Sequence, residues 1–171
     1  MKIRPILLII FLANTSCLVS KETKDTEGRR SIDRVYQLYK DYAWEALGLG
    51  PANSKSIFGE YLEFENKDVL MRYFDSEMAS LLFKDANGFE RKHGQIGKLD
   101  FDPIFASQDP AATDLKLRDI GSNIILTTFI YPGNHTKVSL KYMMVLEKGK
   151  WKIGDIIYPN YGGTSLKKIL K

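Results

Sequence analysis

The stretch that decides the fold is TKVSLKYMMVLEKGKWKIGDIIY, residues 136–158. Apolar and polar side chains alternate through residues 136–146, which is the two-residue period of a strand with one buried face. The next four residues, EKGK, contain Gly149, which can adopt the positive φ that a tight hairpin turn requires. Residues 151–158 form the last strand. The stretch therefore predicts an antiparallel β-hairpin.

Two further strands precede this hairpin. Residues 123–131, NIILTTFIY, are a β-rich run, and residues 114–120 alternate in the same way as the hairpin strands. PGNH, residues 132–135, is a turn. Four strands joined by short turns predict an antiparallel meander, and Thr164 or Ser165 is expected to cap a short C-terminal helix.

The first half of the chain has a helical period. Apolar residues recur at helical spacing after Ser31, the expected N-cap, until the glycines and proline of residues 48–51. Residues 67–83 carry a broad apolar stripe, as in a helix that lies across a sheet. The order predicts an α+β fold, with N-terminal helices packed on one face of a bent four-stranded antiparallel sheet and a short C-terminal helix.

The N-terminal residues are typical of a targeting segment. MKIR is basic, and the apolar run from Ile6 to Ala13 is too short to span a bilayer but suits a secretory signal. We therefore predict a signal peptide at residues 1–17. The polar residues 18–30 lack periodicity and predict a flexible tether, followed by a single domain at residues 31–171.

Cys17 is the only cysteine of the chain and lies where the predicted signal ends. The residues NTSC that end with Cys17 are similar to the lipobox of bacterial lipoproteins, in which the cysteine is acylated. Thr15 and Ser16 fit that motif, whereas Asn14 replaces its usual apolar residue. The alternative is ordinary cleavage after Cys17 or Ser20. We expect an exported protein, either an outer-membrane lipoprotein facing the periplasm or a soluble periplasmic protein.

Composition and charge narrow the class of partner. The chain is 44% hydrophobic and 27% charged, as in ordinary globular proteins. Lys2 and Arg4 account for two of the 25 basic residues, which leaves 23 against 21 acidic residues after the predicted signal. This balance is too mild to predict a nucleic-acid partner. A membrane partner is expected only through a lipid on Cys17.

The stretch LDFDPIFASQDP, residues 99–110, contains three aspartates: Asp100, Asp102 and Asp109. A calcium loop would need a further ligand and a glycine where Ile104 and Phe105 stand. A catalytic pair of Asp100 and Asp102 is an alternative if the segment is extended. Aspartate before proline commonly starts a turn, so we favour aspartates that bond to backbone N–H groups while the apolar residues pack under the sheet.

The element order ending in WKIGDIIY resembles the nuclear-transport-factor-two-like, or cystatin-like, cone. Within that superfamily the chain is similar to small Gram-negative envelope proteins catalogued as a domain of unknown function. The similarity rests on VYQLY from Val35, on LDFDPI followed by Gln108, and on Trp151–Tyr158 followed by Ser165. It covers roughly residues 31 to 171. The resemblance implies export, often as a lipoprotein, and no established reaction.

Cones of this kind can enclose a pocket that some members equip with an acid. Period two places Trp151 and Asp155 on one face of the last strand, with Tyr131 and Tyr142 as candidate hydrogen-bond partners. These four residues are the predicted ligand pocket, and Trp151 is expected in the core. Alternatively, a β-bulge at Gly154 would turn Asp155 outward or towards a backbone group.

Other chemistry has little support in the sequence. His93 and His135 lack the spacing of zinc ligands, and neither a G-x-S-x-G motif nor a phosphate-binding loop is present. We therefore expect no metal and no cofactor. The favoured hypothesis is a non-enzymatic envelope protein that binds a protein partner or a small ligand. The alternatives are an immunity protein against a secreted bacterial toxin, and a small isomerase or hydrolase with Asp155 as base.

Overall fold

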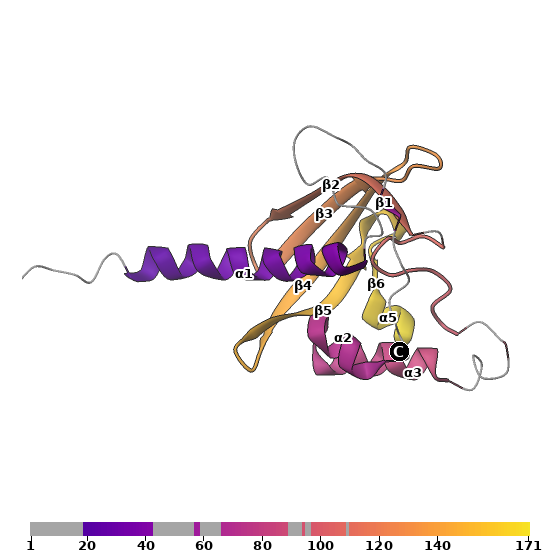
Figure 1. Ribbon diagram of the computed structural model, residues 1–171, viewed down its shortest axis with the longest axis horizontal. Coiled ribbons are helices and arrows are strands. Elements are labelled where there is room, and N and C mark those ends of the chain that lie inside the picture. The colour runs from indigo at the N-terminus through magenta and orange to yellow at the C-terminus, as the bar shows by residue number, and fades with distance from the viewer. Residues whose placement is uncertain (1–18, 43–56, 59–65, 89–93, 95–96, 109) are drawn as a thin grey trace, which may run out of the picture.

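The computed structural model describes residues 19–42, 57–58, 66–88, 94, 97–108 and 110–171. Its elements are helix α1 (Val19–Tyr42), strand β1 (Ile57–Phe58), helices α2 (Lys67–Tyr73) and α3 (Ser76–Ala86), strands β2 (Ala111–Asp119), β3 (Ile124–Ile130), β4 (Lys137–Glu147) and β5 (Lys150–Tyr158), the 3-10 helix η1 (Pro159–Tyr161), strand β6 (Thr164–Ser165) and helix α5 (Leu166–Leu170). Helix α1 lies across one face of the sheet, and α2, α3 and α5 gather beside β5 (Figure 1). The α+β prediction is confirmed.

The described strands form one antiparallel sheet in the order β1-β2-β3-β4-β5-β6. The four long strands are those that the alternation predicts, but the expected count of four is wrong. Two strands of two residues each, β1 and β6, pair with parts of the outer strands β2 and β5. Such short segments carry no periodic signal, and they form because the backbone groups of an edge strand need partners.

Helix α1 starts earlier than the sequence predicts. It begins at Val19, so the backbone of residues 19–30 is helical where we expected an irregular tether. Ser31 is a buried residue inside the helix and not its N-cap. Residues 19–30 contain no proline and are rich in Lys, Glu and Arg, which suit a helix without giving it an apolar face. The expected helix end at residues 48–51 lies outside the described residues.

The predicted helix at residues 67–83 is two helices with a break at Phe74 and Asp75. Asp75 is the N-cap of α3, and its Oδ1 accepts a hydrogen bond of 2.7 Å from the N–H of Met78. The N–H of Asp75 donates to the carbonyl of Ile153 in β5 at 3.0 Å. The break therefore fastens the helical pair to the edge of β5 at Ile153, a part of that edge with which β6 does not pair. Helix α3 ends at Ala86, with Asn87 as its C-cap.

A β-bulge at Gly154 changes the phase of β5. The register between β4 and β5 shifts there, so that Gly154 has no partner opposite. A Cβ atom on this residue would lie 2.9 Å from a methyl group of Val145, so the close approach favours glycine. After the bulge the buried residues are Ile156 and Tyr158, and Asp155 leaves the core face. The β-bulge at Gly154, which the sequence offered as an alternative, is confirmed.

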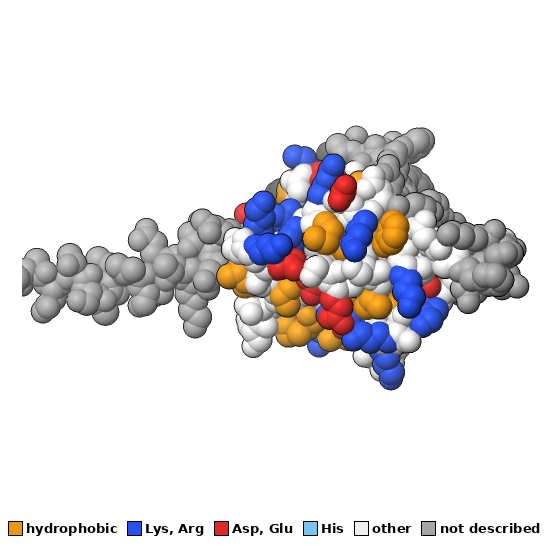
Figure 2. Space-filling model, turned by 90° about the horizontal axis from the view of Figure 1, so that it is seen from below, with side chains coloured by type: hydrophobic (Ala, Val, Ile, Leu, Met, Phe, Trp, Pro, Cys, Tyr) orange, Lys and Arg blue, Asp and Glu red, His pale blue; other side chains and the backbone are white. Residues whose placement is uncertain are grey.

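The core lies between α1, the paired helices and the inner face of the sheet. Its largest fully buried side chains include Tyr39, Phe74, Phe105, Phe129, Tyr142 and Tyr158. Figure 2 shows that acidic and basic side chains are interspersed on the face seen there, with small hydrophobic groups between them. This mixture is typical of a solvated surface.

Candidate functional site

A pocket of about 430 Å³ opens beside the turn that joins β3 to β4. Three parts of the chain that are distant in sequence line it. The described lining residues are Phe101, Phe105, Ala106, Ser107 and Gln108 from the loop before β2, Tyr131, Asn134, Thr136 and Val138 from the β3–β4 turn, and Tyr158, Tyr161, Thr164 and Ile169 from the C-terminal segment. The pocket thus lies at one end of the core face of the sheet.

The lining is aromatic and uncharged. Phe101, Phe105, Tyr131, Tyr158 and Tyr161 contribute rings, and none of the described lining residues carries a charge. Phe101 packs edge-on against Tyr158, with 5.5 Å between the ring centroids and 85° between the ring planes. Such a surface favours flat or branched apolar molecules, because burying a charge without a partner is costly.

Several polar side chains of the pocket form hydrogen bonds that hold its walls together. The Tyr161 hydroxyl donates to the carbonyl of Ala106 at 3.0 Å, which ties η1 to the loop before β2. The Asn134 side-chain oxygen accepts from the N–H of Thr136 at 3.0 Å and shapes the β3–β4 turn. Tyr131 is a further polar residue of the lining. A ligand would therefore find apolar walls with few hydrogen-bonding groups.

Asp102 shapes the loop that forms one wall. Its Oδ1 accepts hydrogen bonds from the N–H groups of Ile104 at 2.9 Å and Phe105 at 3.2 Å. Its own N–H donates to the carbonyl of Ser107 at 2.8 Å. The prediction that Asp102 bonds to backbone N–H groups is confirmed. Asp100 is exposed, and Asp109 lies outside the described residues.

The second oxygen of Asp102 is unusual. The side chain is 2% exposed, and no described residue forms a hydrogen bond with Oδ2. Burial raises the pKa of this carboxyl from 3.8 to about 7, although the bonds from Ile104 and Phe105 lower it in part. The sequence could not reveal this, because an Asp-Pro pair predicts a turn but says nothing about its depth.

Tyr142 belongs to the core and not to the pocket that we predicted. Its hydroxyl lies 2.8 Å from that of Tyr39, and the Tyr39 hydroxyl donates to the carbonyl of Ile104 at 2.7 Å. Because the Tyr39 proton is used on that carbonyl, Tyr142 donates to Tyr39. Burial raises the pKa of both tyrosines, so both stay protonated.

Trp151 is half-buried, so its predicted place in the core is wrong. It follows the β4–β5 turn, at the opposite end of the sheet from the β3–β4 turn. There it lines a shallow depression with Arg34, whose Nε donates to the Trp151 carbonyl at 3.1 Å. Of the four residues predicted to form one pocket, Tyr131 alone lines the pocket described above.

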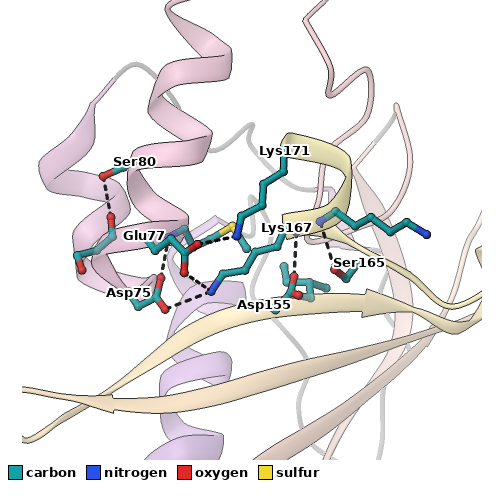
Figure 3. A network of polar contacts seen from close by, with 11 residues as sticks. Asp75, Glu77, Ser80, Asp155, Ser165, Lys167 and Lys171 are labelled. Carbon is teal, nitrogen blue, oxygen red and sulfur yellow. Dashed lines mark hydrogen bonds and ion pairs between the residues drawn. The ribbon is translucent and has the colours of Figure 1, made fainter.

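Asp155 supports the C-terminal helix. Its Oδ1 accepts from the N–H of Ile156 at 2.8 Å and from the N–H of Lys167 at 3.0 Å, which joins β5 to the first turn of α5 (Figure 3). The Lys167 ammonium also lies 2.8 Å from Oε2 of Glu77 in α3. Hydrogen bonds from Lys167 and Lys171 lower the pKa of Glu77 to about 2. Asp155 therefore has the backbone role that the bulge alternative predicted.

Ser165 is the N-cap of α5, and its hydroxyl accepts from the N–H of Lys168 at 3.3 Å. This confirms one of the two expected caps.

The remaining sequence features give no second site. Among the residues with described positions, no three His, Cys, Asp or Glu side chains gather as metal ligands would. Cys17 and His93 lie outside the described residues. Of the described helices, none combines the length and apolar character that crossing a lipid bilayer requires. In comparisons with known proteins, the chain matches no family model, no curated protein and no solved structure.

Proposed function

We propose that this chain is a non-enzymatic protein of the bacterial envelope that binds a small, uncharged and largely apolar molecule in the pocket beside the β3–β4 turn. The observation that carries the proposal is a volume of about 430 Å³ with five aromatic rings and no charged group among its described lining residues. Pockets for small molecules commonly measure roughly 300–1,000 Å³ and are mainly apolar.

The envelope location rests on the N-terminal sequence. The basic start and the apolar run from Ile6 to Ala13 support export, and the residues before Cys17 support acylation there. These residues lie outside the described part of the chain, so location and anchoring stay predictions. A lipid on Cys17 would keep the pocket near a membrane, where apolar molecules concentrate.

The enzyme alternative has weaker support. Asp155 would be the base of such an enzyme, but its Oδ1 accepts hydrogen bonds from two backbone N–H groups. Asp155 is also not among the described residues that line the pocket. An immunity protein would need a surface fitted to a toxin, and no feature of the described geometry favours that role over ligand binding.

The neutral dye N-phenyl-1-naphthylamine tests this proposal, because its fluorescence rises in apolar surroundings. We expect one saturable site with a Kd of about 1–10 μM, the range that a ligand of this size reaches in a good apolar pocket. Its sulfonated, anionic relative should bind at least about tenfold more weakly, since the described lining offers no charge to pair with it. Fluorescence titration measures both values.

Two matched variants locate the site. Thr136→Trp places a large ring in the pocket and should weaken dye binding at least about tenfold. Thr128→Trp makes the same change on the outer face of β3, between the buried Thr127 and Phe129, and should bind like the wild type. Equal binding by both variants, at matched melting temperatures, or a preference for the anionic dye would contradict the proposal.

A further inference from the structure

The loop that walls the pocket is held from beneath by a small set of buried groups. Asp102 bonds to the N–H groups of Ile104 and Phe105. The Tyr39 hydroxyl donates to the carbonyl of Ile104 at 2.7 Å, and the Tyr158 hydroxyl donates to the carbonyl of Pro103 at 3.1 Å. Of the residues held in this way, Phe105 lines the pocket, and Pro103 and Ile104 directly precede it in the chain. Any change in these bonds therefore changes the shape of the pocket.

The groups around Asp102 cannot stabilise a negative charge on its second oxygen. The titratable side chains that act on it are Tyr39 of α1, Tyr142 of β4 and Tyr158 of β5. Burial keeps all three protonated, and each hydroxyl proton is already donated, either to a loop carbonyl or from Tyr142 to Tyr39. An ionised Asp102 would have to break one of these bonds, or move towards water, to gain a partner for Oδ2.

We infer that Asp102 is a positioning residue that makes ligand binding depend on pH: the loop keeps its binding shape while Asp102 is protonated, and ionisation of Asp102 loosens the wall and weakens binding. This inference rests on the proposed function. It assigns to Asp102 no contact with the ligand, since Asp102 is not among the described residues that line the pocket.

The direction of the effect follows from linkage. A ligand that binds better to the protein with a neutral Asp102 favours proton uptake, and protonation in turn favours the ligand. Affinity should therefore be highest at low pH and should fall as the pH rises through the neutral range. Because burial raises the pKa of Asp102 to about 7, the change in affinity should occur around neutral pH.

The test is the Kd of N-phenyl-1-naphthylamine at pH 5.5, 7.0 and 8.5. In wild type we expect binding to weaken about tenfold across this range, and in Asp102→Asn we expect no such change. Asp100→Asn is the matched control, because Asp100 is exposed and lies two positions away, and it should follow the wild type. The two histidines, His93 and His135, also titrate in this range, so the series is repeated with both replaced by glutamine.

The outcomes separate this inference from the proposed function. Dye binding with a Kd that is constant with pH in wild type would overturn the role of Asp102 and leave the pocket in place. A pH response that persists in Asp102→Asn would overturn it as well. Absence of dye binding at every pH would defeat the proposed function itself. If Asp102→Asn does not fold, calorimetry in two buffers decides. The chain with both histidines replaced should take up a fraction of a proton on binding at pH 7.5, because Asp102 is only partly ionised there. No proton uptake overturns the inference.

Discussion

Replacing Phe105 with alanine should lower the free energy of unfolding by about 3–5 kcal/mol, the usual cost of removing a buried aromatic ring. Phe105 is 0% exposed, and its ring packs edge-on against Tyr39 at 5.7 Å and against Phe129 at 6.2 Å between centroids. It joins the loop before β2 to α1 and to the sheet. Because whole domains have stabilities of only about 5–15 kcal/mol, this variant should be close to unfolding. Urea unfolding followed by circular dichroism measures the loss.

Trp151→Ala is the comparison for this result. Trp151 is the larger ring, and the sequence alone placed it in the core, yet it is half-buried beside the β4–β5 turn. We therefore expect it to cost clearly less than Phe105→Ala. A loss for Trp151→Ala that equals or exceeds that of Phe105→Ala would show that the end of the sheet near Trp151 is packed more tightly than described.

Asp102→Asn should remove a pH dependence of stability that the wild type shows between pH 5 and pH 8. The folded-state pKa of Asp102 is raised from 3.8 to about 7, so the folded state binds the proton more tightly than the unfolded state. This contribution to stability is therefore fully present below pH 3.8 and is lost as the pH rises through about 7. Between pH 5 and pH 8 the wild type should lose about 3 kcal/mol from this group.

Urea unfolding at pH 5 and pH 8 checks this prediction. The difference between wild type and Asp102→Asn isolates Asp102 from other titrating groups, and asparagine keeps an oxygen for the N–H groups of Ile104 and Phe105. Asp100→Asn should retain the wild-type slope, because Asp100 is exposed. Parallel pH profiles for wild type and Asp102→Asn would mean that the Asp102 carboxylate has a partner at high pH.

The strands could be predicted because their residues carry two independent signals. Alternation at residues 136–146 anticipated β4, which spans Lys137–Glu147, and EKGK anticipated the turn that follows. In that turn Lys148 and Gly149 both have positive φ, at 51° and 73°. These signals are local, so neighbouring residues are enough to reveal them.

The helix break and the short strand β6 were not predicted, because they depend on contacts between residues that are far apart in the sequence. The helix break at Phe74 and Asp75 exists because Asp75 caps α3 and bonds to Ile153, a residue far along the chain. The pairing of β6 with the end of β5 likewise requires the turn at residues 159–163 to bring them together. Such contacts become visible only when the tertiary structure is known.

The pocket was predictable only in part. Tyr131 was expected in a pocket and lines one. The bulge at Gly154, which the sequence offered as an alternative but alternation alone could not decide, moves Asp155 off the core face. In the stretch at residues 99–110 the aspartates were the candidate functional residues, whereas the aromatic residues Phe101 and Phe105 line the pocket. Pocket residues drawn from loops have no period, so sequence analysis detects them poorly.

The measurement that tests the central claim most directly is a methyl NMR titration of wild type with N-phenyl-1-naphthylamine, with isoleucine methyl groups labelled. Ile169 lines the pocket, and Ile120 is exposed in the β2–β3 turn at the other end of the sheet. Binding in the pocket predicts a saturable shift of the Ile169 signal, with the dye's fluorescence Kd, and an unchanged Ile120 signal. A shift confined to Ile120, or an Ile169 signal that stays unchanged at saturating dye, would contradict the account.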